Sequence, residues 1–266
     1  AGVAAAWATA VCASIGAARA CPPVPAEARS VAALSRAAVL SLDDGTELKL
    51  MGVLLPSAND LPTPPADWPQ QNDALAALDH VLRTRTAKIA ATGAFTDRWS
   101  RRVAHAFAED GSWVQAAIVD AGHARVQALP GETACIRELL TREAVARAKR
   151  IGMWASPAYE IRQARATRTL ERLTGTFQIV EGWVANVGMS RTEVFLNFGR
   201  DWRWDFTAGI ELRRSPDREA AVARLRGLRG KLVRVRGYIE RRNGPFVTLA
   251  APEVIEELPE GLAGGR

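Results

Sequence analysis

The chain has 266 residues, of which 48% are hydrophobic and 24% are charged, and this composition excludes a wholly disordered or collagen-like protein. The length suits a buried core and two small domains, while three cysteines exclude a disulfide-dense scaffold. The formal net charge is +6, and arginine supplies almost all of the basic residues. Two causes stay open: bidentate contacts to phosphate or carboxylate, or an arginine- and alanine-rich composition set by a GC-rich genome.

The N-terminal segment has the pattern of a secretory signal. Residues 1–18 carry no charge, and Ala18-Arg19-Ala20 fits an A-x-A cleavage site. We therefore expect a signal peptide at 1–20, with its true start upstream, and a periplasmic or secreted protein. A retained membrane anchor is the alternative, although the run is short for a spanning helix. A Pro-rich lead at 21–36 follows.

Cleavage after residue 20 removes Cys12 and leaves Cys21 and Cys135. An even pair of cysteines in an exported protein is a candidate disulfide. The alternative is two unpaired thiols. No stable membrane span is expected once the signal is removed.

The region 37–156 reads as a small barrel with helices around it. Asp44-Gly45 is a hairpin signal between two alternating apolar runs, and helical spacing appears at Leu75, Leu78 and Leu82. We predict an α+β domain, mainly β, with a five-stranded OB-like barrel and three helices. Its expected elements are a hairpin at 37–50, a third apolar stretch at 50–56, a Pro-rich loop at 57–71, a helix at 72–86, strands at 87–92 and 102–109, and helices at 112–121 and 134–150.

A helical connector is expected at 157–174, and a second pattern then begins. Residues 175–258 predict three strands, a helix and two more strands, with Asn243-Gly244 as a hairpin signal. This order is typical of a second five-stranded OB barrel. Residues 259–266 are expected to be a tail.

Three motifs in the first region resemble the thermonuclease, or staphylococcal-nuclease-like, family. They are LKLMGVLLPS, TDRWSRRVAHAFAEDGSWVQAAIVDAGHARV and LLTREAVARAKRIGMW. The resemblance covers roughly residues 37–156 and implies an OB-like fold. It also implies calcium-assisted hydrolysis of phosphodiesters.

The family's catalytic positions are only partly kept. Its first arginine falls on Lys49, and Arg101 matches a catalytic arginine. Leu54 stands where the family has a metal-binding aspartate, and Ser57 stands at the position of the base glutamate. Arg36 and Ala38 stand where two further aspartates are expected.

Because leucine cannot bind calcium and serine is a poor base at neutral pH, the resemblance predicts a degenerate site with no bound metal or other cofactor. The three histidines have no metal-ligand spacing, which agrees with this expectation. A shifted alignment that brings Asp43 or Asp44 to the metal site stays open as an alternative. Calcium is expected only in that case or if the enzyme is active.

Residues 213–242 are strongly basic, and Arg234 and Arg236 alternate with valines on one strand face. A basic face with exposed aromatic rings is how OB folds hold single strands. We predict a nucleic-acid-binding surface, against the alternative of a solvated basic face or a protein-binding surface. Its candidate residues are Arg234, Arg236, Arg241, Arg242, Trp202 and Trp204.

These observations favour an exported binding module over a hydrolase. Its predicted partner is single-stranded nucleic acid, another polyanion or an envelope protein. The first alternative is a calcium-dependent phosphodiesterase with residual or altered activity. The second is a purely structural envelope protein. The oligomeric state stays open.

Overall fold

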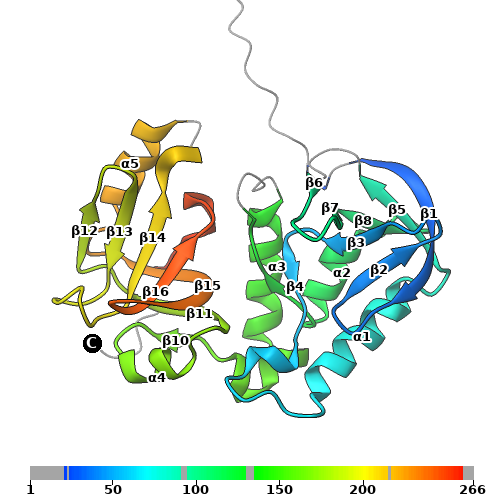
Figure 1. Cartoon of the computed structure of the whole chain (residues 1–266), viewed down its shortest axis with the longest axis horizontal. Helices are drawn as coiled ribbons and strands as arrows, with labels where there is room; N and C mark the ends of the chain where they lie inside the picture. Colours follow the sequence, from blue (N-terminus) through cyan, green and yellow to red (C-terminus); the bar gives the residue numbers. More distant parts are fainter. Residues whose placement is uncertain (1–20, 23, 91–94, 130–134, 215–216, 260–266) are drawn as a thin grey trace, which may run out of the picture.

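The computed structural model describes residues 21–22, 24–90, 95–129, 135–214 and 217–259, and these form two domains side by side (Figure 1). The predicted signal peptide and most of the predicted tail lie outside the described residues. The first domain runs from β1 to the 3-10 helix η2, and the second from β10 to β17. None of the described helices is long and apolar enough to cross a membrane.

The first domain combines a curled sheet with the three predicted helices. Its seven-stranded sheet has the order β6-β7-β3-β2-β1-β5-β8, and β4 pairs separately with β9. The elements are β1 (Pro25–Leu34), β2 (Val39–Leu42), β3 (Glu47–Leu50), β4 (Val53–Leu54), η1 (Ala58–Asp60), α1 (Pro69–Val81), β5 (Thr86–Ala90), β6 (Phe95–Thr96), β7 (Arg102–Ala104), β8 (Ala106–Ala108), α2 (Val114–Asp120), β9 (Arg125–Val126), α3 (Ile136–Ala148) and η2 (Gly152–Ala155).

The segment expected to be only a Pro-rich lead forms the longest strand of this domain. Strand β1 pairs antiparallel with both β2 and β5. It was missed because its sequence, PAEARSVAAL, is mostly polar or alanine and carries little β-forming signal. Only Val31 of this strand is buried, so its place in the sheet rests on backbone pairing rather than on an apolar face.

The run expected as one strand at 102–109 bends at His105 into β7 and β8. Strand β7 pairs with β3, while β8 pairs with β5 at the other end of the same sheet. Consecutive halves of one run can reach both ends only if the sheet curls back on itself. The pairings among described residues nevertheless form an open path, not a closed barrel.

The second domain has four strands, a helix and two strands where three strands, a helix and two strands were predicted, because the first predicted strand is divided into β11 and β12, and it has further elements at both ends. Its sheet has the order β10-β11-β15-β16-β14-β13-β12, with β17 beside β15. The elements are η3 (Pro157–Tyr159) before it, then β10 (Arg162–Gln163), α4 (Thr167–Arg172), β11 (Phe177–Trp183), β12 (Asn186–Met189), β13 (Glu193–Asn197), β14 (Thr207–Glu211), η4 (Leu212–Arg214), α5 (Arg218–Arg226), β15 (Leu232–Arg242), β16 (Gly244–Leu249), η5 (Pro252–Val254) and β17 (Glu256–Glu257).

The expected helical connector is helical only in part. Residues 167–172 form α4, while 162–163 add the short strand β10 alongside β11. The Arg-rich composition favoured a longer helix, but parallel pairing with β11 holds the chain extended at Arg162.

Helix α3 lies between the two domains (Figure 1), and buried ion pairs join them there. Glu143 of α3 is fully buried and accepts from Arg236 of β15 at 2.8 Å. The same carboxylate accepts from the backbone N–H of Val126 at 2.8 Å. Arg125 donates to the carbonyl oxygen of Phe177 at 2.8 Å, which adds a second polar link between the domains.

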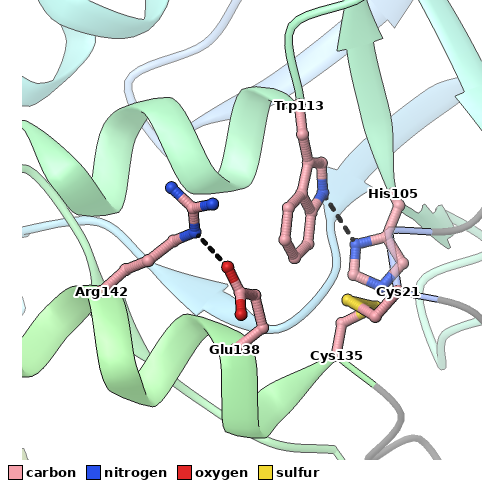
Figure 2. Close-up of a disulfide and its surroundings, with 6 residues drawn as sticks. All are labelled: Cys21, His105, Trp113, Cys135, Glu138 and Arg142. Atoms are coloured by element: carbon pink, nitrogen blue, oxygen red, sulfur yellow. Dashed lines mark hydrogen bonds and ion pairs between the residues drawn. A yellow bond between two sulfur atoms is a disulfide. The ribbon is translucent and has the colours of Figure 1, made fainter.

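The predicted disulfide between Cys21 and Cys135 is present, with a Cα–Cα distance of 5.3 Å. It ties the segment before β1 to the start of α3 (Figure 2). Trp113 and His105 belong to its surroundings, where Trp113 Nε1 donates to His105 Nδ1 at 3.3 Å (Figure 2). Burial lowers the pKa of His105 to about 4, so this side chain accepts as a neutral imidazole.

Candidate functional site

The positions that the resemblance assigns to the family's site, except Arg101, meet in one pocket. Most of its lining belongs to the first domain, and Gly175 and Tyr238 line it from the second domain. The pocket has a volume of about 230 Å³. Lys49 reaches it from β3, and Leu54 and Ser57 from β4 and the start of η1, while Arg36 and Ala38 come from the turn before β2. The fold therefore brings together residues that belong to different strands and turns of the chain.

Asp60 is the acidic residue of this pocket lining, and its oxygens already have partners. Arg125 lies 2.7 Å from Oδ1. The hydroxyl of Tyr159 donates to Oδ2 at 2.9 Å, and the backbone N–H of Ser57 donates to the same atom at 2.9 Å. Trp68 Nε1 in turn donates to the Tyr159 hydroxyl at 2.8 Å. Asp60 is thus held in a buried network that fixes the 57–68 loop.

The described donors of the pocket do not fit a calcium ion. Calcium takes six to eight hard oxygen ligands, whereas the lining offers one engaged carboxylate, the Asn59 amide and the Ser57 hydroxyl. Ser57 also has a local role, since its Oγ accepts from the backbone N–H of Asn59 at 3.2 Å and caps η1. No group of three or more His, Cys, Asp or Glu suited to a metal occurs among the described residues.

The shifted alignment through Asp43 or Asp44 has no support from this pocket, because neither residue lines it. Asp44 instead accepts from the backbone N–H of Thr46 at 2.9 Å inside the hairpin turn. It also lies 3.6 Å from Arg29 of β1. The turn chemistry of the Asp-Gly pair accounts for this carboxylate.

Lys49 and Arg101 lie close enough to influence each other. Burial lowers the pKa of Lys49, and the positive charge of Arg101 lowers it further, while Asp97 acts in the opposite direction. Arg101 donates through Nε and Nη2 to Asp97 Oδ2 at 2.9 and 2.8 Å. The arginine at the matched catalytic position is therefore paired within its own turn and does not line the pocket.

An aromatic ring with two guanidinium groups lies in that turn. Trp99 is 58% exposed, and the guanidinium carbons of Arg98 and Arg101 lie 3.9 and 4.6 Å from its ring centroid. Cation–π contacts of this kind hold a tryptophan in a fixed orientation at the surface. Trp99 lies within the DRWSR motif but was not predicted to be a site residue.

The basic strip of the second domain does not form the predicted solvent-facing surface. Arg234 and Arg236 share one strand face, as predicted, but Arg236 is 4% exposed and pairs with Glu143 and Glu256. Arg234 lies 2.7 Å from Glu181 and 3.4 Å from Glu256. That part of the prediction is wrong because α3 and β17 cover this face with acids that lie outside the basic run.

The other four candidate residues are at the surface. Arg241 is exposed, and Arg242 donates to both oxygens of Glu193 at 2.9 and 2.6 Å. Trp202 and Trp204 are 52% and 67% exposed. They lie in a turn before β14. Of the two, only Trp202 lines the pocket described further below.

Comparison with protein families gives one match. Residues 47–156 match the family described as staphylococcal nuclease homologue. No curated protein matches the chain. The matched segment begins at β3 and ends just after η2, so it contains all three helices and most of the pocket lining but excludes Arg36, β1, β2 and the second domain.

Proposed function

We propose that this protein, in which residues 47–156 form a staphylococcal nuclease homologue domain, is exported and binds single-stranded nucleic acid without cleaving it. The observation that carries the proposal is the composition of the pocket at the family's catalytic positions. Arg36 and Lys49 line it, while its carboxylate, Asp60, is committed to Arg125 and Tyr159. A cationic pocket without carboxylates available for a metal holds a phosphate rather than hydrolysing it.

The surface next to Lys49 supports a single strand as the partner. Trp99 offers an exposed ring on which a base can stack, and base–aromatic stacking needs an unpaired base. Arg98 and Arg101 both lie against that ring; Arg101 is paired with Asp97, and Arg98 places positive charge beside the ring. Phosphate contacts from these groups carry no base specificity, so the proposal is a sequence-tolerant binder.

The disulfide supports export. Bonds between cysteines persist in oxidising compartments such as the periplasm and the cell exterior, and Cys21 and Cys135 are bonded here. The bond joins two parts of the chain 114 residues apart in sequence, and the loop that it closes contains the elements from β1 to β9.

The test is a titration of a fluorescently labelled single-stranded DNA 12-mer with purified protein, in EDTA and in calcium, with strand cleavage followed in parallel. We expect equal binding in both buffers and no cleavage. Lys49→Ala should weaken binding and make the salt dependence shallower by about 0.7 in log–log slope, as expected for one lost phosphate contact on a single strand. Lys231→Ala, an exposed lysine of the second domain, is the matched control and should leave both quantities unchanged.

Other outcomes identify the alternatives. Cleavage that a chelator abolishes would show the calcium-dependent phosphodiesterase. Equal affinity for heparin and for the DNA would show a general polyanion binder. The absence of binding to either would leave the structural role and overturn the proposal.

A further inference from the structure

The second domain contains a pocket of about 430 Å³ with aromatic walls, separate from the one at Lys49. Phe195 from β13 and Phe246 from β16 meet edge to face, with ring centroids 6.5 Å apart. Trp202, half-exposed in the turn before β14, completes the aromatic lining. The volume falls within the range of small-ligand sites in proteins.

Two glycines shape this pocket. Gly188 of β12 belongs to its lining, and a Cβ there would lie 3.5 Å from Asn197 Nδ2 and 3.9 Å from Phe195 Cβ. A larger side chain at this position would therefore extend into the open space. Gly209 of β14 lies under the ring of Phe246, since a Cβ there would come within 2.4 Å of its Cζ. The aromatic wall is thus set by the backbone of two strands.

The pocket is close to neutral. Arg242 is the charged residue among its described lining residues, and both its terminal nitrogens donate to Glu193. These hydrogen bonds also hold the pKa of Glu193 below its ordinary value. The guanidinium carbon lies 4.8 Å from the centroid of Phe246, so the paired arginine forms part of the wall. Such a pocket favours an uncharged ring over a phosphate.

Amides supply the polar groups. Asn186, Asn197 and Asn243 line the pocket, and each amide offers both donors and an acceptor, the pattern that matches the edge of a nucleobase. Asn197 Oδ1 accepts from the hydroxyl of Thr207 at 3.3 Å, which orients this side chain. Polar groups on an aromatic pocket fix the orientation of a flat ring.

Positive charge lies outside the pocket rather than in it. Arg203 and Arg241 are exposed, and each is next to a lining residue in the sequence. Arg203 also lies 3.8 Å from Asp201, and exposed Arg200 precedes the same turn. The guanidinium carbon of Arg203 lies 5.2 Å from the ring centroid of Trp202. A neutral cavity with a cationic rim suits a strand whose base enters while its phosphates stay outside.

We infer that this pocket takes one unpaired nucleobase of a single strand, stacked on Trp202 and oriented by the asparagine amides. The inference rests on the proposed function for its ligand class, and it adds a second contact point that the nuclease homologue domain does not contain. A sugar ring of a glycan is the competing occupant, because aromatic rings with amides also hold sugars.

The experiment titrates the full chain with the labelled 12-mer and, separately, with free nucleosides, which carry no phosphate. Trp202→Ala should weaken binding of the 12-mer by about 5- to 150-fold, the effect of losing one stacked base. Trp204→Ala is the matched control: it removes a more exposed tryptophan from the same turn that does not line the pocket, and it should leave affinity unchanged within twofold. Gly188→Leu should abolish nucleoside binding, whereas Gly188→Ala should weaken it less.

The outcomes separate this inference from the proposed function. If the 12-mer binds and Lys49→Ala weakens it, but Trp202→Ala and Gly188→Leu do not, the base pocket is wrong and the proposed function stands. If the 12-mer does not bind but nucleosides bind in a Gly188→Leu-sensitive way, the pocket stands and the proposed function fails. Binding of N-acetylglucosamine oligomers in place of nucleosides would overturn the nucleobase. Urea unfolding of each variant checks that lost binding is not lost folding.

Discussion

Strands β7 and β8 of the first domain are consecutive pieces of one run that pair at β3 and β5, far apart in the sheet order. Strands β11 and β12 of the second domain do the same, pairing with β15 and β13 at opposite ends of their sheet. In both domains one bent strand thus makes the sheet curl. The domains differ in whether a disulfide stabilises them and in the side chains that line their pockets.

The first domain is closed by a disulfide and presents cations, whereas the second contains no cysteine and presents a neutral aromatic pocket. Asp60, the carboxylate of the pocket lining, does not neutralise Lys49 or Arg36, because it is paired with Arg125. In the second domain, the positive charge of Arg242 is neutralised by its ion pair with Glu193. Similar curled sheets thus carry pockets of different chemistry, one lined by cations and one by aromatic rings and amides.

The largest effect should come from removing the disulfide. Replacing Cys21 and Cys135 by serine frees a loop that spans 114 residues of sequence, and the chain-entropy model assigns such a loop about 5 kcal/mol of unfolding free energy. Urea unfolding measures the loss, and wild type in reductant should match the double variant. Equal unfolding midpoints for wild type and variant would show that the first domain does not depend on this bond.

The next effect concerns the contact between the domains. Glu143→Leu leaves Arg236 buried without its main partner, and breaking a buried pair in this way costs about 4 kcal/mol. Glu138→Leu on the same helix is the matched control, since its pair with Arg142 is exposed and should cost under about 1 kcal/mol. Urea unfolding of wild type should give one transition for both domains. Two separate transitions would show that the domains are not coupled through α3.

The histidine contribution to pH-dependent stability should belong to the first domain, because all three histidines lie there. Burial lowers the pKa of His105 to about 4, while the unfolded chain has a value near 6.5. Below pH ~6.5 the unfolded state takes a proton that the folded state does not, so stability falls by about 3 kcal/mol as the pH drops towards 4. His105→Gln should flatten this fall in urea titrations, and exposed His80→Gln should not. An unchanged pH profile in His105→Gln would contradict the assignment.

The smallest effect is a change of affinity with pH. Lys49 has a lowered pKa, so its charge is lost at a lower pH than that of an ordinary lysine. Affinity for the 12-mer should therefore weaken by a few-fold as the pH rises through this lowered value. Lys49→Arg should remove the decline, because arginine stays protonated, while nucleoside binding in the second domain should not change. A decline that persists in Lys49→Arg would assign the titration to another group.

Most elements of both domains were predicted from the sequence. The Asp44-Gly45 and Asn243-Gly244 turns and the three helices of the first domain follow from local turn chemistry and helical spacing. Strand β1 was not predicted, because its neighbours in the sheet, rather than its own side chains, hold it extended. The same reason applies to β10.

The candidate sites, like the fold, could be predicted from the sequence only in part. The sequence by itself determined which residue types stand at Lys49, Leu54 and Ser57, and therefore the shortage of carboxylates there. It also determined which two cysteines are left to pair once the predicted signal is removed. These inferences need only residue identity at positions fixed by a local motif.

Only the tertiary structure determined which carboxylates pair with the arginines of the basic run. The basic run at 213–242 contains three acids, but Arg234, Arg236 and Arg242 pair with glutamates outside that window: Glu143, Glu181, Glu193 and Glu256. Alternation predicted a shared face for Arg234 and Arg236 but not the helix and strand that cover it. It also gave no reason to separate Trp202 from Trp204, although only the first lines a pocket. A strand pattern specifies which side chains share a face, and long-range packing determines whether that face meets solvent, a neighbouring carboxylate or a ligand.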